Sequence, residues 1–350
     1  MNRIGNLKVV QWLGEISYPL YLWHWPVLVI PSVAWGRSLQ AYELLFCVLL
    51  TALLADLTHR FIENPIRYSK PQPRLIVKSG AAATAVSLAL GASIYFSFDD
   101  RITLDNGRSY SVSEMIKKPV IYDDSCHVNN GETLSPECTY GQRGAKKKIV
   151  LFGDSHAAQW FPALERLANE YKFELISLTK SACPGPAVEK VDSGEYKNAD
   201  CFAWRDNSFD RIAELKPYAV IFSGFQHFEV PDGYSTRREW WQAGQRRTLD
   251  ALRGNATHIV YITDTPHPQQ DIPACLAGGV ISDCDDTERS EPISIPGLKA
   301  INPTPWLCTS KCSSVINELV AYRDGSHISI AMSESFTQPL SAALKRLGVL

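Results

Sequence analysis

Residues 148–171 read KIVLFGDSHAAQWFPALERLANEY, and this segment determines which class of fold the chain can adopt. Its first five residues form a short apolar run that is typical of a buried strand. From Ala157 onward, apolar residues recur at helical spacing. Gly153 stands between the two patterns, where glycine permits a tight turn. The segment therefore predicts a strand, a sharp turn and a helix.

Further strand-like segments follow at residues 173–178, 218–223 and 257–263, and helical patterns such as that at 237–253 separate them. Strands that alternate with helices predict an α/β domain with a parallel sheet. Ligands of such domains bind at the carboxyl ends of the strands. The net charge of −2 over 350 residues argues against nucleic acid as the main partner.

The first predicted strand runs into Gly153-Asp154-Ser155-His156 at the start of the predicted helix. A serine at a helix amino terminus lies near free backbone amides and partial positive charge, which favour an oxyanion. That environment suits a nucleophile. Serine is also a common helix N-cap, so both interpretations of Ser155 stay open. His156 either lines the same site or caps the helix.

A second motif, Asp324-Gly325-Ser326-His327, lies near the end of the chain. An Asp and a His three residues apart in a turn can both face one site. His327 would then accept the proton of a serine, and Asp324 would orient the imidazole and stabilise its charged form. Alone, the pattern is equally compatible with ordinary loop residues. It gains weight because the serine motif closes the first strand and this motif precedes the final predicted helix.

That order of motifs resembles the SGNH (GDSL-like) hydrolase family over residues 146–350. The resemblance implies a three-layer α/β domain around a central parallel sheet. It also implies a catalytic triad of Ser155, His327 and Asp324. In this family the oxyanion hole takes backbone N–H groups from the nucleophile and from a glycine after the second strand, and a Gly-x-Asn-Asp segment after the third strand completes it.

This chain departs from the family pattern at the oxyanion hole. Residues 179–184 follow the second strand and carry no glycine at the expected place, so a backbone N–H of Lys180 or Ser181 would serve. The third strand leads into Gly224-Phe225-Gln226-His227, with Gln226 where asparagine is usual. The predicted oxyanion-hole residues are therefore the following: Ser155, Ser181, Gly224 and Gln226.

Other candidate residues have weaker support. Residues 263–268 follow the fourth predicted strand at the active-site edge, and we expect them to be structural loop residues. Trp204, Trp240 and Trp241 could stack on sugar rings, although buried aromatic side chains are more common.

The cysteines indicate an oxidising compartment. Cys47 lies in an apolar run, where it packs as a small apolar residue, and an even number of cysteines follow it. Their local grouping favours nearest-neighbour disulfides, although eight cysteines allow 105 pairings. The histidines are scattered and no close C-x2-C pair occurs, so no metal site is expected. The four expected pairs are Cys126 with Cys138, Cys183 with Cys201, Cys275 with Cys284, and Cys308 with Cys312.

Three apolar runs, at residues 13–33, 42–57 and 79–98, each approach the roughly 20 residues that span a bilayer. They predict three transmembrane helices, with buried helices of a soluble protein as the alternative. Basic residues between the second and third runs place that loop in the cytoplasm and everything after residue 98 outside. His24 in the first run is either a packed, hydrogen-bonded histidine or a group that lines a pathway.

The segments LGEISYPLYLWHWPVLV at 13–29 and ADLTHRFIENPIR at 55–67 resemble the last part of the acyltransferase family 3 (AT3) membrane domain. The resemblance covers roughly residues 10–70. Proteins of that family O-acylate cell-surface polysaccharides, and their catalytic histidine and arginine motifs lie in earlier helices. His24 does not match that histidine. The resemblance therefore implies a partner that carries the missing amino-terminal helices.

These observations predict a membrane segment at 1–98, an extracytoplasmic linking extension at 99–146 and an SGNH domain at 147–350. The combination resembles bacterial polysaccharide O-acetyltransferases, including those that modify lipopolysaccharide O-antigen. It implies transfer of an acetyl group from acetyl-CoA, through the membrane half, to a polysaccharide hydroxyl. It also implies an inner-membrane protein whose SGNH domain lies in the periplasm. The alternatives are a carbohydrate acetyl esterase and a non-catalytic glycan-binding module.

Overall fold

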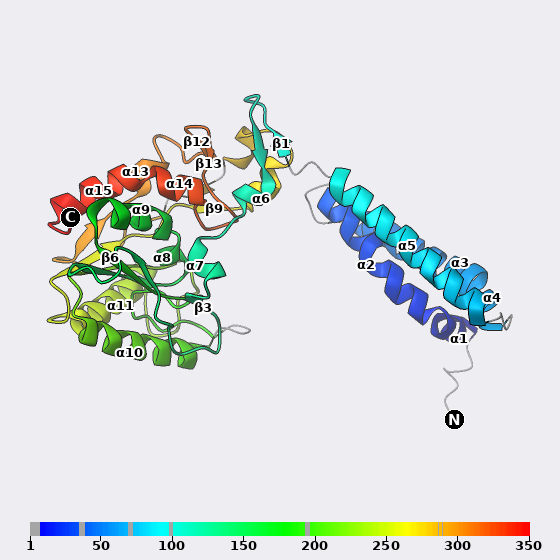
Figure 1. Cartoon of the computed structure of the whole chain (residues 1–350), viewed down its shortest axis with the longest axis horizontal. Coiled ribbons are helices and arrows are strands. Elements are labelled where there is room, and N and C mark those ends of the chain that lie inside the picture. The colour runs from blue at the N-terminus through cyan, green and yellow to red at the C-terminus, as the bar shows by residue number, and fades with distance from the viewer. Residues whose placement is uncertain are drawn as a thin grey trace. The chain divides into compact units, whose positions relative to one another are not determined.

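The computed structural model describes residues 8–34, 39–68, 73–97, 101–192, 197–285, 287–288 and 290–350. The chain divides into two compact units, Met1–Asp100 and Arg101–Leu350 (Figure 1). The predicted boundary between residues 98 and 99 lies outside the described residues.

The first unit is helical, and α2 packs along α3 in it (Figure 1). Two indole N–H groups bind α3 to the helices before it. Trp12 Nε1 of α1 donates to Asp56 Oδ1 at 2.8 Å, and Trp23 Nε1 of α2 donates to Thr58 Oγ1 at 2.9 Å. Its elements are α1 (Lys8–Glu15), α2 (Ser17–Ala34), α3 (Ala41–Thr58), η2 (His59–Glu63), α4 (Asn64–Tyr68) and α5 (Pro73–Ser97).

One continuous helix, Ala41–Tyr68, is long and apolar enough to cross a membrane among the residues that the structure describes. Its 28 residues extend about 42 Å, which exceeds the ~30 Å hydrocarbon core. The prediction of three transmembrane helices is thereby corrected to one candidate. The first predicted span is divided at Ile16 into α1 and α2, and α2 is rich in tyrosine, tryptophan and proline. The third predicted span ends at residue 98, outside the described residues, and α5 is rich in alanine, serine and glycine.

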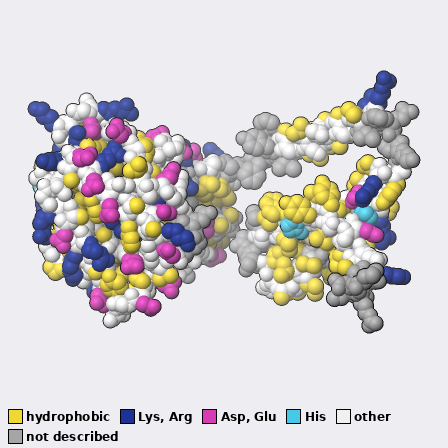
Figure 2. Space-filling model, turned by 90° about the horizontal axis from the view of Figure 1, so that it is seen from below, with side chains coloured by type: hydrophobic (Ala, Val, Ile, Leu, Met, Phe, Trp, Pro, Cys, Tyr) yellow, Lys and Arg dark blue, Asp and Glu magenta, His cyan; other side chains and the backbone are white. Residues whose placement is uncertain are grey.

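Exposed large hydrophobic side chains are concentrated in the first unit, as Figure 2 shows. Phe46 and Leu49 on α3 are 65% and 62% exposed. On the second unit, lysine, arginine, aspartate and glutamate side chains are interspersed across the visible face (Figure 2). An apolar helical surface of this extent indicates contact with lipid or with further helices.

A seven-stranded sheet forms the centre of the second unit, in the order β11-β8-β7-β5-β6-β3, with β4 also paired to β6. Every pairing is parallel except that of β4 with β6. The predicted α/β domain with a central parallel sheet is confirmed. The strands are β3 (His127–Val128), β4 (Thr139–Gly141), β5 (Lys148–Gly153), β6 (Glu174–Lys180), β7 (Ala219–Ser223), β8 (His258–Ile262) and β11 (Lys299–Ile301).

The segment predicted as a linking extension contributes β3 and β4 to this sheet. Both strands pair with β6, because Thr179 is the partner of His127 and Ile176 is the partner of Thr139. The two short strands thus occupy successive parts of one edge. Neither has a long apolar run, so the sequence pattern did not reveal them.

Helices cover both faces of the sheet (Figure 1). Along β5, Ile149 and Leu151 are buried in the core on one face, and Val150 and Phe152 are buried in the core on the other. This alternation is the strand period of two. The helices of the two faces are α8 (Ser155–Ala158), α9 (Phe161–Tyr171), α14 (Ile330–Ser335) and α15 (Thr337–Arg346) on the first, and α10 (Asn198–Leu215) and α11 (Arg237–Leu252) on the second.

Shorter elements build the remaining walls of the second unit. They are β1 (Arg101–Thr103), β2 (Ser109–Ser111), α6 (Val112–Met115), α7 (Val120–Asp123), β9 (His267–Pro268), α12 (Ile272–Leu276), η3 (Ser282–Cys284), β10 (Thr287–Glu288), α13 (Thr304–Leu307), β12 (Val315–Ile316) and β13 (Leu319–Val320).

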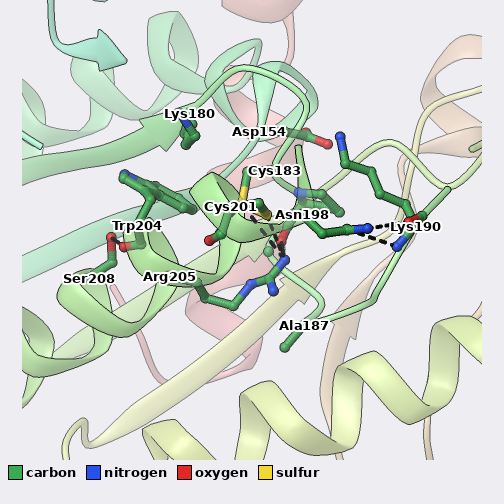
Figure 3. Close-up of a disulfide and its surroundings, with 12 residues drawn as sticks. Asp154, Lys180, Cys183, Ala187, Lys190, Asn198, Cys201, Trp204, Arg205 and Ser208 are labelled. Carbon is green, nitrogen blue, oxygen red and sulfur yellow. Dashed lines mark hydrogen bonds between the residues drawn. A yellow bond between two sulfur atoms is a disulfide. The ribbon is translucent and has the colours of Figure 1, made fainter. Parts of the chain in front are cut away.

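Four disulfides lie within the second unit, and they link the same nearest-neighbour cysteines that the local grouping favours. Cys47 is a buried free cysteine in the first unit. The disulfide between Cys183 and Cys201 lies beside the buried Arg205 (Figure 3). Arg205 Nη2 donates to the carbonyl of Pro184 at 3.2 Å and so ties α10 to the loop after β6.

Candidate active site

The turn from β5 to α8 positions Ser155. Gly153 has φ +140°, and a Cβ there would lie 2.2 Å from the carbonyl oxygen of Ser223, so glycine is required. Asp154 is the N-cap of α8, since its Oδ1 accepts from the backbone N–H of His156 at 2.8 Å. Ser155 is therefore the first residue of the helix, and the interpretation of Ser155 or His156 as the cap does not hold.

Asp154 also fixes this turn to the next loop. Its Oδ2 accepts from the backbone N–H of Phe225 at 2.9 Å, and the side chain is fully buried. Burial raises the pKa of Asp154 in spite of these hydrogen bonds. The carboxyl group thus bridges the loops that follow β5 and β7, and Ser155 sits on a rigid support.

Asp324 holds His327 in one orientation. His327 Nδ1 lies 2.8 Å from Asp324 Oδ2, and the backbone N–H groups of His327 and Ser326 donate to Asp324 Oδ1, each at 2.8 Å. Burial raises the pKa of Asp324, but the hydrogen bonds from His327 and Ser326 outweigh it and hold that pKa well below its usual range. Asp324 is therefore an ionised acceptor.

The protonation of His327 decides what its second ring nitrogen can do. Burial lowers the pKa of His327 to about 4, and the neighbouring His156 contributes to that shift. Nε2 is buried and has no hydrogen-bond partner among the described residues. With Nδ1 engaged by Asp324, a neutral ring carries its lone pair on Nε2. Such a nitrogen can accept a proton.

One cavity of about 410 Å³ brings together the three predicted triad residues. Ser155, Asp324 and His327 all line it, although Asp324 and Ser155 are far apart in the sequence. The cavity lies beyond the carboxyl end of β5, where ligands of parallel sheets bind.

A second carboxylate–histidine pair lies beside the first. His156 Nδ1 is 2.7 Å from Asp264 Oδ1, and both side chains are almost completely buried. Burial lowers the pKa of His156, but the Asp264 carboxylate outweighs it, so the net shift is upward. The His156 ring centroid is 4.5 Å from that of His327. Asp264 lies in a loop, as expected, and it also holds His156, which lines the cavity described above.

Two of the predicted oxyanion-hole donors are engaged elsewhere. The Ser181 N–H donates to the carbonyl of Val128 at 2.9 Å. The Gln226 N–H donates to Asp264 Oδ2 at 2.9 Å, and its side-chain Nε2 donates to the carbonyl of Glu291 at 3.0 Å. Lys180 extends its side chain to carbonyl groups of the loop after β3.

Ala182 is a cavity residue that sequence reasoning missed. It lines the cavity with Ser155 and has φ +51°, a conformation that turns the chain sharply after β6. Within the described residues, the backbone N–H groups of Ser155 and Ala182 make no hydrogen bond. Gly224 is not among the residues that line the cavity. Its Cβ position lies 2.5 Å from Pro184 Cβ, so a packing constraint explains this glycine.

Further polar side chains of the cavity were not identified from the sequence. They come from the segment at 118–127, from the loop after β6 and from the position before Asp324. Of these places, only the position before Asp324 could have been found from the sequence, because it is adjacent to a motif residue. The missed residues are Lys118, Tyr122, His127, Lys190 and Arg323.

The remaining candidates are structural. Trp204, Trp240 and Trp241 are fully buried, and Trp204 stacks on Phe152 with ring centroids 5.3 Å apart, so none is available to a sugar. His24 Nδ1 contacts the carbonyl of Tyr21 within its own helix, at 2.5 Å. Among the described residues, no group of His, Cys, Asp and Glu could hold a metal ion.

The family model described as "SGNH domain (fused to AT3 domains)" matches residues 125–341. The chain belongs to this family. The match begins before residue 147, which agrees with the place of β3 and β4 in the central sheet.

Curated relatives match shorter parts of the chain. O-acetyltransferase OatA of Staphylococcus aureus is 40% identical over 63 residues, which are 18% of this chain and 10% of that protein. Peptidoglycan O-acetyltransferase OatA of Listeria monocytogenes is 34% identical over 68 residues, 19% of this chain and 11% of that protein. The matched parts are thus about a tenth of these relatives' length.

Among solved structures, the chain is similar to the periplasmic domain of a lipopolysaccharide acetyltransferase from Salmonella ser. Paratyphi A. The TM-score is 0.48 at 15% sequence identity, and the match covers 58% of this chain and 85% of that chain.

Proposed function

We propose that the second unit is a serine O-acetyltransferase that acylates a hydroxyl of a bacterial cell-surface polysaccharide. The observation that carries this proposal is the shared cavity, which is lined by Ser155 and by a histidine that Asp324 orients and whose Nε2 has no partner among the described residues. Membership of a family of SGNH domains fused to AT3 domains supports the same class of reaction.

In the first half-reaction, Ser155 Oγ attacks the carbonyl carbon of an acetyl donor, and His327 Nε2 accepts the hydroxyl proton. A C–O bond forms to Ser155, and the carbonyl electrons move to oxygen as an oxyanion. When the oxyanion collapses, the bond to the leaving group breaks and His327 returns the proton to that group. The product is acetyl-Ser155.

In the second half-reaction, a glycan hydroxyl replaces the leaving group. His327 accepts its proton, the hydroxyl oxygen attacks acetyl-Ser155, and the proton returns to Ser155 Oγ as the ester bond to the serine breaks. Water in place of the glycan would make the enzyme an esterase. The outcome depends on which acceptor the cavity admits.

We propose that the backbone N–H groups of Ser155 and Ala182 bind the oxyanion. Both residues line the cavity, and both N–H groups are unengaged among the described residues. They replace the predicted donors Ser181 and Gln226, whose N–H groups already have acceptors. Loss of one oxyanion donor typically costs ~10²–10³ in rate, so the identity of the donors matters.

We propose acetyl-CoA as the ultimate donor, with its acetyl group passed outward by AT3 helices of a partner. Four disulfides support an oxidising location for the second unit, which we propose to be the periplasm. Lipopolysaccharide O-antigen is the acceptor that the resemblance suggested, and the name of the Listeria relative adds peptidoglycan to the acceptors worth testing.

The test uses the full chain in detergent, oxidised, with p-nitrophenyl acetate as donor and bacterial glycans as acceptors. We expect acetyl release and a covalent acetyl adduct on the protein, and we expect Ser155→Ala to abolish both. Ser113→Ala is the matched control, because Ser113 is exposed and does not line the cavity.

Transfer of the acetyl group to glycan would support a transferase, and release to water alone would favour an esterase. Full activity of Ser155→Ala would show that the nucleophile is another residue. Absence of any turnover, with a folded protein, would contradict catalysis by this unit alone.

A further inference from the structure

One wall of the Ser155 cavity carries an arginine with unused donors. Arg323 is 3% exposed, and its Nη1 and Nε make no hydrogen bond among the described residues. Nε lies 3.5 Å from Asp324 Oδ2, which provides a charge contact on one side of the guanidinium only. A buried guanidinium with unpaired N–H groups is costly unless a ligand supplies acceptors.

Tyr122 extends the same wall. Its Oη is buried and makes no hydrogen bond of good geometry among the described residues, although the Arg323 side chain lies close enough to lower the pKa that burial raises. The ring stacks on His127 with centroids 4.3 Å apart, and Arg323 Cζ lies 5.5 Å from its centroid. Lys118 Nζ lies 5.4 Å from the same ring. Two cations and a phenol therefore converge beside the catalytic pair.

The acidic groups of the cavity accept no hydrogen bond from the unpaired donors of this wall. Both oxygens of Asp154 accept backbone N–H groups, and Asp324 is engaged by His327 and Ser326. Lys190, a further cation of the cavity lining, extends its side chain toward Asp154 (Figure 3). The donors of Arg323 and Tyr122 are thus left to face a ligand.

We propose that Arg323, Tyr122 and Lys118 bind an anionic oxyacid group, a carboxylate or a phosphate, on the glycan acceptor next to the hydroxyl that is acylated. The planar guanidinium fork matches such groups in a bidentate manner. Asp324 contacts Arg323 through Nε alone, so an oxyacid group can still pair with the remaining guanidinium donors, whereas a neutral sugar offers only uncharged hydroxyl acceptors. This inference rests on the proposed function, and it narrows the acceptor to acidic or phosphorylated glycans.

A simpler account is that Arg323 only supports Asp324, through the 3.5 Å contact. The two accounts differ in what a variant changes. If Arg323 served Asp324 alone, its replacement would slow acylation of every acceptor equally. If Arg323 binds an anion, its replacement lowers the ratio of kcat/KM for an anionic acceptor to kcat/KM for a neutral one. That ratio cancels any general loss of activity.

The experiment uses the full chain in detergent and three acceptors: methyl glucuronide, glucose 6-phosphate and methyl glucoside. Transfer from p-nitrophenyl acetate is measured for wild type, Arg323→Gln, Arg323→Lys and Lys118→Gln. We expect wild type to prefer an anionic acceptor by tenfold or more, Arg323→Gln to lose that preference, and Arg323→Lys to retain part of it. The two anionic sugars distinguish carboxylate from phosphate.

Lys117→Gln is the matched control. Lys117 is adjacent to Lys118 in sequence, but it pairs with Glu114 and lines a different cavity. The control should keep the wild-type ratio. A wild-type ratio near one, or an unchanged ratio in Arg323→Gln, would overturn the anion site while leaving the proposed function intact.

Binding of the same sugars to Ser155→Ala, measured by titration calorimetry, tests the site without turnover. The site is supported, even without transfer, if Ser155→Ala binds an anionic sugar more tightly than methyl glucoside and the added substitution Arg323→Gln abolishes this difference. Equal binding of all three sugars contradicts it. Failure of the anion site and failure of the catalytic proposal therefore give different results.

Discussion

At the scale of single residues, the proposed chemistry depends on the ring of His327. Asp324 holds one of its nitrogens, and the ring of His156 lies against it at 4.5 Å. Burial and the charge on His156 both disfavour protonation of His327, so it stays neutral well below neutral pH. A neutral histidine in the cavity that Ser155 lines is what the proposed nucleophilic attack requires.

The lowered pKa of His327 predicts how activity depends on pH. The pKa of His327 is lowered to about 4, so the base is neutral above that pH and is lost by protonation as the pH falls through it. We expect kcat/KM for Ser155-dependent ester cleavage to stay level from pH 7 to about 5 and to fall near pH 4.

His156→Gln removes one of the influences that lower the pKa of His327. We therefore expect the acid limb of the pH profile to move to higher pH in this variant. Complete loss of activity would instead show that His156 is needed for the structure of the site. The measurement is the pH profile of kcat/KM for wild type and variant. An acid limb at the same pH in both would contradict an electrostatic role for His156.

At the scale of elements, the turn between β5 and α8 limits where Ser155 can lie. Gly153 meets the backbone of β7, and Asp154 accepts N–H groups from α8 and from the loop after β7. Three consecutive residues therefore combine a positive φ, a helix cap and the proposed nucleophile. Changes in this turn should affect folding and activity together.

Gly153→Ala tests the turn. The new Cβ would lie 2.2 Å from the Ser223 carbonyl in a backbone conformation that L-residues rarely adopt, so we expect a loss of roughly 2–3 kcal/mol or more in the free energy of unfolding. Gly254→Ala is the control, since Gly254 has φ +82° but no atom within 4 Å, and it should lose only ~1–2 kcal/mol.

Chemical denaturation of the two variants, followed by tryptophan fluorescence, measures the difference. Residual activity toward p-nitrophenyl acetate gives a second readout for Gly153→Ala. Equal losses of stability in both variants would show that the contact with Ser223 contributes nothing beyond backbone strain.

At the scale of the whole molecule, two units of different chemistry share one chain. The first exposes large apolar side chains on helices, and the second has an interspersed charged surface and four disulfides. The helix Ala41–Tyr68 is the described element best suited to cross a bilayer. The chain therefore combines a membrane-compatible unit with a unit built for an oxidising space.

Membrane extraction tests this division. We expect the full chain to stay with the membrane fraction after alkaline carbonate treatment, because one apolar helix of this length anchors a protein. Replacement of Leu49 by lysine, near the middle of the apolar part of that helix, should increase release, because a charge at the bilayer centre costs about 2.5–3.5 kcal/mol on insertion scales. Complete release of the unmodified chain would contradict membrane insertion.

The sequence by itself determined the alternation of strands and helices, the two motifs that line the candidate site and the local pairing of cysteines. These features depend on neighbours in the chain, because apolar period, turn residues and short cysteine spacing are local properties. The family match over residues 125–341 bears out the family that the motifs indicated.

Only the tertiary structure decided which groups lie around Ser155. His156 and Asp264 are separated by 108 residues, and β3 and β4 join the sheet without a sequence signal of their own. Whether the N–H of Ser181 or Gln226 is available also depends on distant acceptors, Val128 and Asp264. These contacts depend on which distant segments the fold brings together. No local sequence pattern encodes that.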